Sequence, residues 1–260
     1  MMLNKKLEDI LNDRTSGSTE ILQKLVNFFI SYPENLNELQ IVHLKNHFGT
    51  FQIIKNFLNE LQKYISSKGK SEITDFLKSY LSKTENNLHS IFVNALPYLE
   101  PKQKIVTISN SKTLLYVLNE YYKIQTNFEV TILESRPMFE GRILAEELLK
   151  HGIKTNLITE AMTANAVEHS DAVIIGADNI LSNGDVINKT GSRNLAIICK
   201  YFSKPFYVIA DKTKFSMNNE FEKSCHNSEE IWKFPPDKIK IENYYFEKVE
   251  VDLISKIIHD

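Results

Sequence analysis

The chain has little cysteine and no long apolar run, and both absences limit what it can be. Its 260 residues include two cysteines, Cys199 and Cys225, which is too few for a disulfide framework and shows neither a CxxC pair nor the spacing of a zinc site. No apolar stretch approaches the roughly 20 residues needed to span a bilayer. We therefore expect a soluble, cytoplasmic protein with no membrane association.

Glycine-rich phosphate motifs and an excess of charge of one sign are also absent. The sequence contains neither GxGxxG nor a Walker A motif, which argues against ordinary dinucleotide or P-loop chemistry. The formal net charge is −2, and this balance argues against nucleic-acid binding as the main role. His43 and His47 have the spacing of helical metal ligands, but no third ligand is apparent, so we expect no metal site and no cofactor.

Helical periodicity dominates the first part of the chain. Apolar residues recur at helical spacing within 21–29, 51–61, 73–81 and 88–96. Pro97 and Pro101 flank the end of this part, and each biases the preceding residue away from the helical conformation. We therefore predict a helical N-terminal domain over residues 1–100.

From Lys104 onward, short apolar runs alternate with helical stretches. The runs predict strands at 105–108, 130–133, 155–158, 172–175 and 206–209, and the stretches predict helices at 112–123, 141–151, 162–169 and 192–202. This alternation is typical of a parallel sheet covered by helices. The predicted fold class is therefore α/β, with a Rossmann-like domain over residues 101–260, and the end of the chain predicts a further helix at 252–259.

The segment from Gly176 to Gly191 combines glycines with a carboxylate, an amide and an ammonium group. It carries Asp178, Asn188 and Lys189 between a predicted buried strand and a predicted helix. Because the N-terminus of a helix attracts anions, we expect a phosphate there with Lys189 as its counter-charge. The alternative is an ordinary connection with a turn at Asn183-Gly184.

Polar side chains also follow two other predicted strands. Residues 107–111 carry small polar side chains that suit phosphate binding or a nucleophile, but equally suit helix capping. Arg136 and Arg142 suit bidentate recognition of phosphate, or they pair with Glu134 and Glu140 and hold the loop together. Ligands collect at the carboxyl ends of parallel strands, so we expect these side chains along one rim of the sheet.

The two thiols lie away from that rim. Cys199 falls on the apolar face of the helix predicted at 192–202, where a thiol is buried and inert. Cys225 lies in a polar segment beside His226, so an activated nucleophile is an alternative there, although we favour an unreactive thiol.

An ordered series of motifs resembles a single superfamily. The superfamily contains the alpha, beta and delta subunits of translation initiation factor 2B, methylthioribose-1-phosphate isomerase and ribose-1,5-bisphosphate isomerase. The likeness covers residues 104 to about 233 and extends loosely to Ser16-Gly17-Ser18 and Phe48-Gly49-Thr50. Its motifs are Thr107 to Ser111, Glu134 to Pro137, Glu140 to Arg142, Gly176 to Asp178, Asn183-Gly184, Asn188 to Gly191, Pro205 to Val208 and Lys212 to Phe215.

The resemblance implies a set of site residues. The isomerases move protons between the first two sugar carbons with a cysteine and an aspartate; the aspartate matches Asp178, whereas the cysteine position falls on Ser109. Ser16 stands where the isomerases carry an arginine. The positions matched to phosphate and hydroxyl contacts, together with two candidates from the strand rim, are Gly17, Ser18, Ser111, Arg136, Glu140, Asn188, Lys189 and Lys214.

The exchange of sulfur for oxygen at Ser109 separates two functions. A thiol with a pKa of about 8.5 can act as a base near neutrality, whereas a serine hydroxyl needs an adjacent base, and no histidine neighbours Ser109 in the sequence. We therefore expect a non-catalytic protein, regulatory or translation-related, that binds a sugar phosphate or nucleotide in an isomerase-derived pocket. The alternatives are a working aldose–ketose isomerase (an intramolecular oxidoreductase) of ribose 1,5-bisphosphate or methylthioribose 1-phosphate, and a structural subunit without ligand.

The resemblance also implies protein partners. Members of this superfamily pair through their Rossmann-like domains and often build larger rings, so we expect a homodimer or a higher oligomer. Translation initiation factor subunits are further expected partners.

Overall fold

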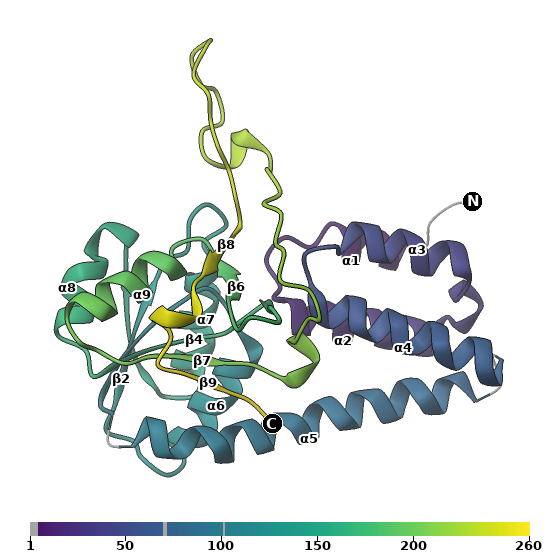
Figure 1. Cartoon of the computed structure of the whole chain (residues 1–260), viewed down its shortest axis with the longest axis horizontal. Helices are drawn as coiled ribbons and strands as arrows, with labels where there is room; N and C mark the ends of the chain where they lie inside the picture. Colours follow the sequence, from purple (N-terminus) through teal and green to yellow (C-terminus); the bar gives the residue numbers. More distant parts are fainter. Residues whose placement is uncertain (1–4, 70–71, 101) are drawn as a thin grey trace.

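The fold has a helical N-terminal region beside a parallel α/β sheet, as the sequence predicts (Figure 1). The structure is a computed structural model that describes residues 5–69, 72–100 and 102–260. The expected role of Pro101 falls outside the described residues.

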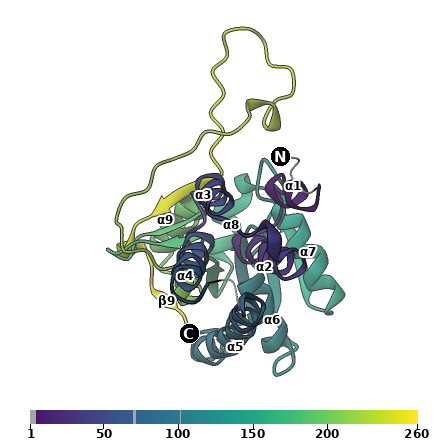
Figure 2. The same cartoon turned by 90° about the vertical axis from the view of Figure 1, so that its right-hand side faces the viewer.

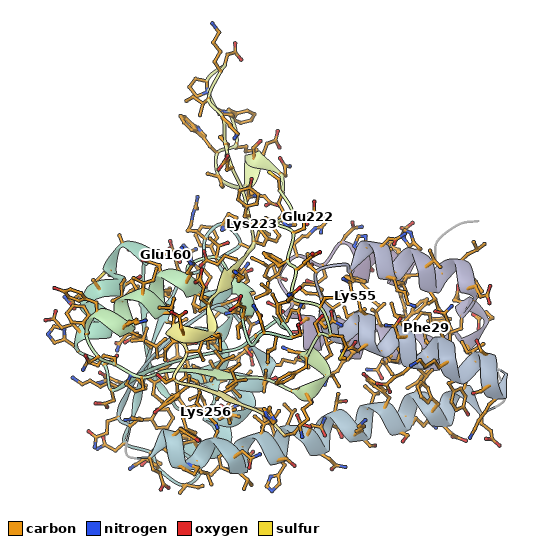
Figure 3. The ribbon with its side chains drawn as sticks, in the orientation of Figure 1. Phe29, Lys55, Glu160, Glu222, Lys223 and Lys256 are labelled. Atoms are coloured by element: carbon orange, nitrogen blue, oxygen red, sulfur yellow. The ribbon has the colours of Figure 1, made fainter. Side chains whose placement is uncertain are left out.

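Amphipathic helices build the N-terminal region. Their apolar faces form one core that runs from Leu7 to Tyr80 and includes Phe29, which lies among these helices in Figure 3. Within the described ranges no helix is long and apolar enough to cross a membrane. The helices are α1 (Lys5–Leu11), α2 (Ser18–Ser31), α3 (Glu38–His47), α4 (Gln52–Lys68) and α5 (Ile73–Leu99), with a 3-10 turn at Pro33–Asn35.

Helix α5 belongs to both parts of the molecule. It is 27 residues long and runs beneath the N-terminal helices and the sheet (Figure 1). Its first turns place Leu77 and Tyr80 in the N-terminal core, whereas Ile91 and Leu99 lie in a second core against the sheet. The helix thereby fixes the N-terminal region beside the sheet.

The main sheet has six parallel strands in the order β3-β2-β1-β4-β7-β9. Central strand β1 pairs on both sides, so that Ile105 lies opposite Val130 of β2 and Ala172 of β4. When only these six parallel strands are numbered along the chain, their order is 3-2-1-4-5-6. This is the doubly wound arrangement, in which the strand order reverses between the first and fourth strands. The strands are β1 (Lys104–Ile108), β2 (Glu129–Leu133), β3 (Lys154–Ile158), β4 (Ala172–Ile175), β7 (Phe206–Ile209) and β9 (Lys256–Ile258).

Helices cover the two faces of this sheet and bury different sides of its strands. Residues of α5, α6 and α7 pack with Ile132 and Ile174 on one face. Residues of α8 and α9 pack with Val173 and Val208 on the other. The covering helices are α6 (Lys112–Tyr122), α7 (Glu140–Lys150), α8 (Thr163–Glu168) and α9 (Ser192–Tyr201), in agreement with the predicted positions.

Two features at the end of the domain differ from the sequence-based predictions. The Gly176 to Gly191 segment contributes β5 (Asn179–Ile180) and β6 (Val186–Lys189) to a small antiparallel sheet with β8 (Phe246–Val249). The predicted helix at 252–259 is wrong: the chain forms a 3-10 turn at Val251–Leu253 and then strand β9. Strand β9 pairs with β7, and Ile257 lies opposite Val208.

An extended arm, residues 216–245, projects from the body (Figures 1 and 2). It follows the 3-10 turn Lys212–Lys214, contains a second one at Ser228–Glu230, and returns directly into β8. Glu222 and Lys223 lie near the point where it leaves the body (Figure 3). The arm exposes large apolar side chains, with Trp232 47% and Phe234 80% exposed.

Candidate functional site

A pocket lies where the carboxyl ends of β1 and β4 meet the N-terminal helices. This is the point at which strand order reverses, the usual ligand position in an open parallel sheet. Its volume is about 120 Å³. A single water needs about 10–15 Å³ on the same measure, so the pocket admits a small organic molecule.

Several parts of the chain contribute the pocket walls. The sheet side supplies the loops after β1 and β4, strand β6 and the start of α7. The N-terminal region supplies the loops before α2 and α4, and the arm supplies its foot. The residues that carry polar groups to these walls include Asp13, Arg14, Ser18, His47, Ser109, Ser111, Lys112, Glu140, Asp178, Asn188, Lys189, Lys214, His226 and Tyr245.

The structure brings together all the predicted site residues except one. Ser109 and Asp178 line the pocket with Gly17, Ser18, Ser111, Glu140, Asn188, Lys189 and Lys214. Arg136 does not line it: its guanidinium donates to the Ile231 carbonyl oxygen at 3.3 Å and lies over the Phe139 ring. The expected ligand contact of Arg136 is therefore not supported by its position. The roles of the other residues in binding or catalysis stay predictions.

The loop before α2 is a closely braced turn. Asp13 Oδ1 accepts hydrogen bonds from the backbone N–H groups of Thr15 and Ser16, while Lys24 Nζ donates to Asp13 Oδ2 at 2.7 Å and to Ser16 Oγ at 2.8 Å. Burial alone would raise the pKa of Asp13, but the hydrogen bonds from Lys24, Ser16 and Thr15 outweigh it and hold that pKa well below its ordinary value.

Gly17 lets this turn approach the loop after β1. A Cβ atom at Gly17 would lie 2.9 Å from the Asn110 carbonyl oxygen, so any side chain would push the two loops apart. One residue later, Ser18 Oγ donates to Asp178 Oδ1 at 2.8 Å. Asp178 therefore joins the N-terminal region to the sheet across the pocket.

Ser109 sits in a strained backbone conformation. Its φ is 68°, in the left-handed region that residues other than glycine seldom adopt, and its N–H donates to Ser135 Oγ at 2.8 Å. Ser135 has a similar φ of 66°. Such strain persists only where the surroundings enforce it, and it clusters at functional sites. The position matched to the isomerase cysteine thus keeps an unusual geometry with serine in place.

Lys189 and Glu140 form a buried ion pair in the wall of the pocket. Both side chains are almost inaccessible, and the Lys189 ammonium donates to Glu140 Oε1. Burial raises the pKa of Glu140, although the charge of Lys189 opposes this shift. Glu140 Oε2 has no hydrogen-bond partner among the described residues. The ammonium expected to balance a phosphate is therefore already neutralised within the protein.

Lys214 and Asn188 are also engaged by the protein. Lys214 Nζ donates to the Ala177 carbonyl oxygen at 2.6 Å. Burial lowers the pKa of Lys214, against the opposing charges of Asp178 and Asp211. Asn188 Nδ2 donates to Ser192 Oγ at 2.9 Å. These side chains hold the floor of the pocket in a fixed arrangement.

The backbone donors at the N-terminus of α9, where the sequence favours a phosphate, are engaged by the protein itself. Glu247 Oε1 accepts the backbone N–H groups of Gly191 at 2.6 Å and Arg193 at 2.9 Å. A carboxylate from β8 therefore occupies the donors that the phosphate was expected to use. The turn at Asn183-Gly184 is present, within the β5–β6 hairpin.

Other motifs take the structural alternatives that the sequence left open. Ser111 caps α6, because its Oγ accepts the Leu114 N–H at 3.3 Å. Arg142 pairs with Glu134 at 2.9 Å. Among the described residues, no cluster of three or more His, Cys, Asp or Glu side chains is placed to share a metal ion. Cys199 is buried, which raises its pKa to about 12, and Cys225 is exposed outside the pocket.

Sequence reasoning located Gly17 and Ser18 at the start of α2, but it missed the contributions of the arm and of Arg14. His226 and Tyr245 stack with ring centroids 3.7 Å apart at the foot of the arm, and Tyr245 donates to Glu230 at 2.5 Å. Arg14 reaches the pocket from two residues before Ser16. The Cys225-His226 pair suggests only a candidate thiol. No local sequence pattern indicates that the arm returns to the rim of the sheet.

A sequence profile described as "Initiation factor 2 subunit family" matches residues 12–260. The chain belongs to this family. The resemblance inferred from the rim motifs is thereby confirmed.

Relatives of this family member include both translation proteins and isomerases. A translation initiation factor eIF-2B subunit 2-like protein of Pyrococcus furiosus is 27% identical over 216 residues, which cover 81% of this chain and 78% of that protein. Methylthioribose-1-phosphate isomerase of Bacillus licheniformis is 31% identical over 198 residues, which cover 67% of this chain and 55% of the isomerase. Family membership alone therefore does not choose between binding and catalysis.

Solved structures share the same fold. The crystal structure of the Pyrococcus horikoshii OT3 translation initiation factor eIF-2B superposes with a TM-score of 0.83 and 23% identity, covering 99% of this chain and 96% of that one. At this identity the likeness shows the fold alone.

Proposed function

We propose that this family member binds a phosphorylated sugar or a nucleotide in the pocket, and that its role is regulatory or translation-related rather than catalytic. The observation that carries the proposal is the convergence of two helix N-termini on the pocket. Ser18 and Thr19 begin α2, Ser111 and Lys112 begin α6, and all four line the cavity. Unpaired N–H groups and the helix dipole at such ends favour a phosphate.

The charges of the pocket support the same ligand class. Lys189 is neutralised by Glu140, and Lys214 lies close to Asp178. Lys112 donates instead to the uncharged Gln23 at 2.8 Å, so its positive charge is not compensated by this contact. A phosphate would supply the missing negative charge next to the start of α6.

The surroundings of Ser109 support the absence of catalysis. Among the described residues, the Ser109 hydroxyl makes no hydrogen bond to a histidine or a carboxylate that could accept its proton. Asp178 keeps one oxygen engaged with Ser18. A serine hydroxyl with no adjacent base does not relay protons at neutral pH.

Binding is tested by thermal unfolding and calorimetric titration with ribose 1,5-bisphosphate, ribose 5-phosphate and adenosine monophosphate, with unphosphorylated ribose as the control. We expect a saturable rise in melting temperature with a phosphorylated compound and none with ribose, because a ligand that binds only the folded state stabilises it. No rise with any phosphorylated compound would contradict the proposal and favour a structural subunit without ligand.

A second candidate is an aldose–ketose isomerase, and the placement of Asp178 and a strained Ser109 in the same pocket favours it. The titration samples decide between the two functions when they are also analysed for products. Conversion of ribose 1,5-bisphosphate to ribulose 1,5-bisphosphate would establish the isomerase. Binding without conversion would support the non-catalytic protein.

We further infer that the chain forms a homodimer or a larger oligomer in the cytoplasm, with translation initiation factor subunits as further partners. The apolar residues of the arm support this, since large exposed apolar groups on a projecting segment mark protein contacts. Light scattering after gel filtration is expected to give at least twice the monomer mass of 30.1 kDa. A mass equal to the monomer at micromolar concentration would contradict this inference.

A further inference from the structure

The braced turn before α2 presents Arg14 to the pocket. We propose that Arg14 provides a phosphate-binding charge at this site, in addition to that of Lys112. This inference rests on the proposed binding of a phosphorylated ligand. It assigns the anion to the mouth of the pocket, between the start of α2 and the foot of the arm.

Arg14 is a cation without an acceptor among the described residues. Lys189 has Glu140, Lys214 has the Ala177 carbonyl oxygen, and Lys112 has Gln23. Within the described part of the chain, no hydrogen bond or ion pair involves the guanidinium of Arg14, although Arg14 lines the pocket. A planar guanidinium can give two parallel hydrogen bonds to a phosphate, which makes it better suited to that role than a lysine.

The neighbouring Asp13 carboxylate does not pair with the positive charge of Arg14. Asp13 has its two oxygens occupied by Thr15, Ser16 and Lys24. These contacts hold the backbone of the turn while leaving the next side chain exposed. The turn is further fixed by the close approach of Gly17 to the Asn110 carbonyl oxygen. Arg14 therefore projects from a preorganised support, which lowers the entropic penalty of ligand binding.

Among the described residues, another polar group without a partner lines the same pocket as Arg14. His226 lines the pocket, and its Nε2 is buried without a hydrogen-bond partner among the described residues. A buried polar atom without a partner is destabilising unless a ligand or water satisfies it.

Arg14 lines the same pocket as the foot of the arm and interacts with its side chains electrostatically. Burial lowers the pKa of His226, the charges of Arg14 and Lys189 lower it further, and Glu230 opposes them. Arg14 also counteracts the rise in the pKa of Tyr245 that burial and Glu230 produce. An anion bound by Arg14 would thus lie within reach of His226 and of the uncapped N-terminus of α2.

The test compares Arg14→Gln and Arg14→Lys with the unmodified full-length protein by calorimetric titration. We expect Arg14→Gln to weaken binding of ribose 1,5-bisphosphate about 10- to 100-fold, the usual effect of losing a charge-assisted hydrogen bond. Arg14→Lys should restore part of the affinity, because it keeps the charge but not the two-pronged geometry. The difference should shrink at high salt concentration.

Arg193→Gln is the matched control, since it removes another half-exposed arginine, one that pairs with Glu250 and does not line the pocket. It should leave the affinity unchanged. Melting temperatures without ligand should be the same for Arg14→Gln and the unmodified protein, because Arg14 makes no contact that stabilises the fold. Equal affinity of Arg14→Gln and the unmodified protein would overturn the role of Arg14 alone. Absence of binding by the unmodified protein would overturn the proposed function and this inference together.

Discussion

Replacing Lys189 by methionine is expected to lower the free energy of unfolding by about 3–5 kcal/mol, because the Glu140 carboxylate would remain buried without a counter-charge. Glu140 is almost inaccessible, and its Oε2 already lacks a partner among the described residues. Burial also raises its pKa. Chemical denaturation followed by circular dichroism measures the change, which is a large share of the usual total stability of a domain.

The double variant Lys189→Met/Glu140→Leu separates the ion pair from simple loss of packing. Apolar residues of similar volume often replace a buried pair with little loss, so the double variant should unfold closer to the unmodified protein than the single one does. Lys123→Met breaks the exposed pair between Lys123 and Glu120 and should change stability little. If Lys189→Met unfolds like Lys123→Met, the charge of Glu140 is not held by Lys189.

Replacing Gly141 by alanine is expected to lower the melting temperature by about 6–12 °C. A Cβ atom at this position would lie 1.9 Å from the Leu133 carbonyl oxygen and 2.9 Å from the Leu133 carbonyl carbon, so the start of α7 must move away from the end of β2. Overpacking against fixed backbone lowers stability by about 3 kcal/mol. For a chain of this size that corresponds to about 2–4 °C per kcal/mol.

The matched control is Gly49→Ala, whose Cβ would meet the nearest backbone atoms at 3.4 and 3.7 Å, an ordinary contact. It should change the melting temperature by only a degree or two. Because Glu140 directly precedes Gly141, the displaced helix should also weaken ligand binding in Gly141→Ala. Equal melting temperatures for the two alanine variants would show that α7 accommodates the methyl group.

The parallel sheet could be predicted because its central strands are short apolar runs, and burial on both faces demands that pattern. Strand β4 is the clearest case, with all four residues from Ala172 to Ile175 buried. Strands β1 and β7, which flank β4, follow the same rule. The helices between the strands show apolar residues at helical spacing. The position of Asp178 at the rim then follows from topology, since parallel strands all end at the same edge.

The small antiparallel sheet and strand β9 could not be predicted by the same reasoning. Strand β5 has two residues, and β8 mixes exposed and buried positions, so neither gives a periodic signal. The segment containing β9 spaces its isoleucines in a way that fits a helix as well as a strand. What decides its conformation is the open edge of β7, a feature of the assembled sheet rather than of the segment.

The site residues that directly follow strands could be predicted from the sequence. Arg14 and His226, which come from distant loops of the N-terminal region and of the arm, could not. Ser109 and Asp178 come directly after strands, so the sequence locates them. Arg14 and His226 come from loops far apart in the sequence, and only the folded chain brings them to one cavity. The ion pair between Lys189 and Glu140 could not be predicted either, because complementary charge alone does not show which carboxylate pairs with a buried lysine.

Helix α5 makes the two regions mechanically dependent on each other. Its beginning is anchored among the N-terminal helices, whereas its final turns, from Ile91 to Leu99, complete the core beneath the sheet. A fragment that starts at residue 101 would lose the part of the sheet's covering layer that α5 provides beside α6 and α7. A fragment that ends at residue 100 would expose the apolar side chains at the end of α5. The pocket between the regions is therefore held by a continuous strut, which resists hinge motion of one region away from the other.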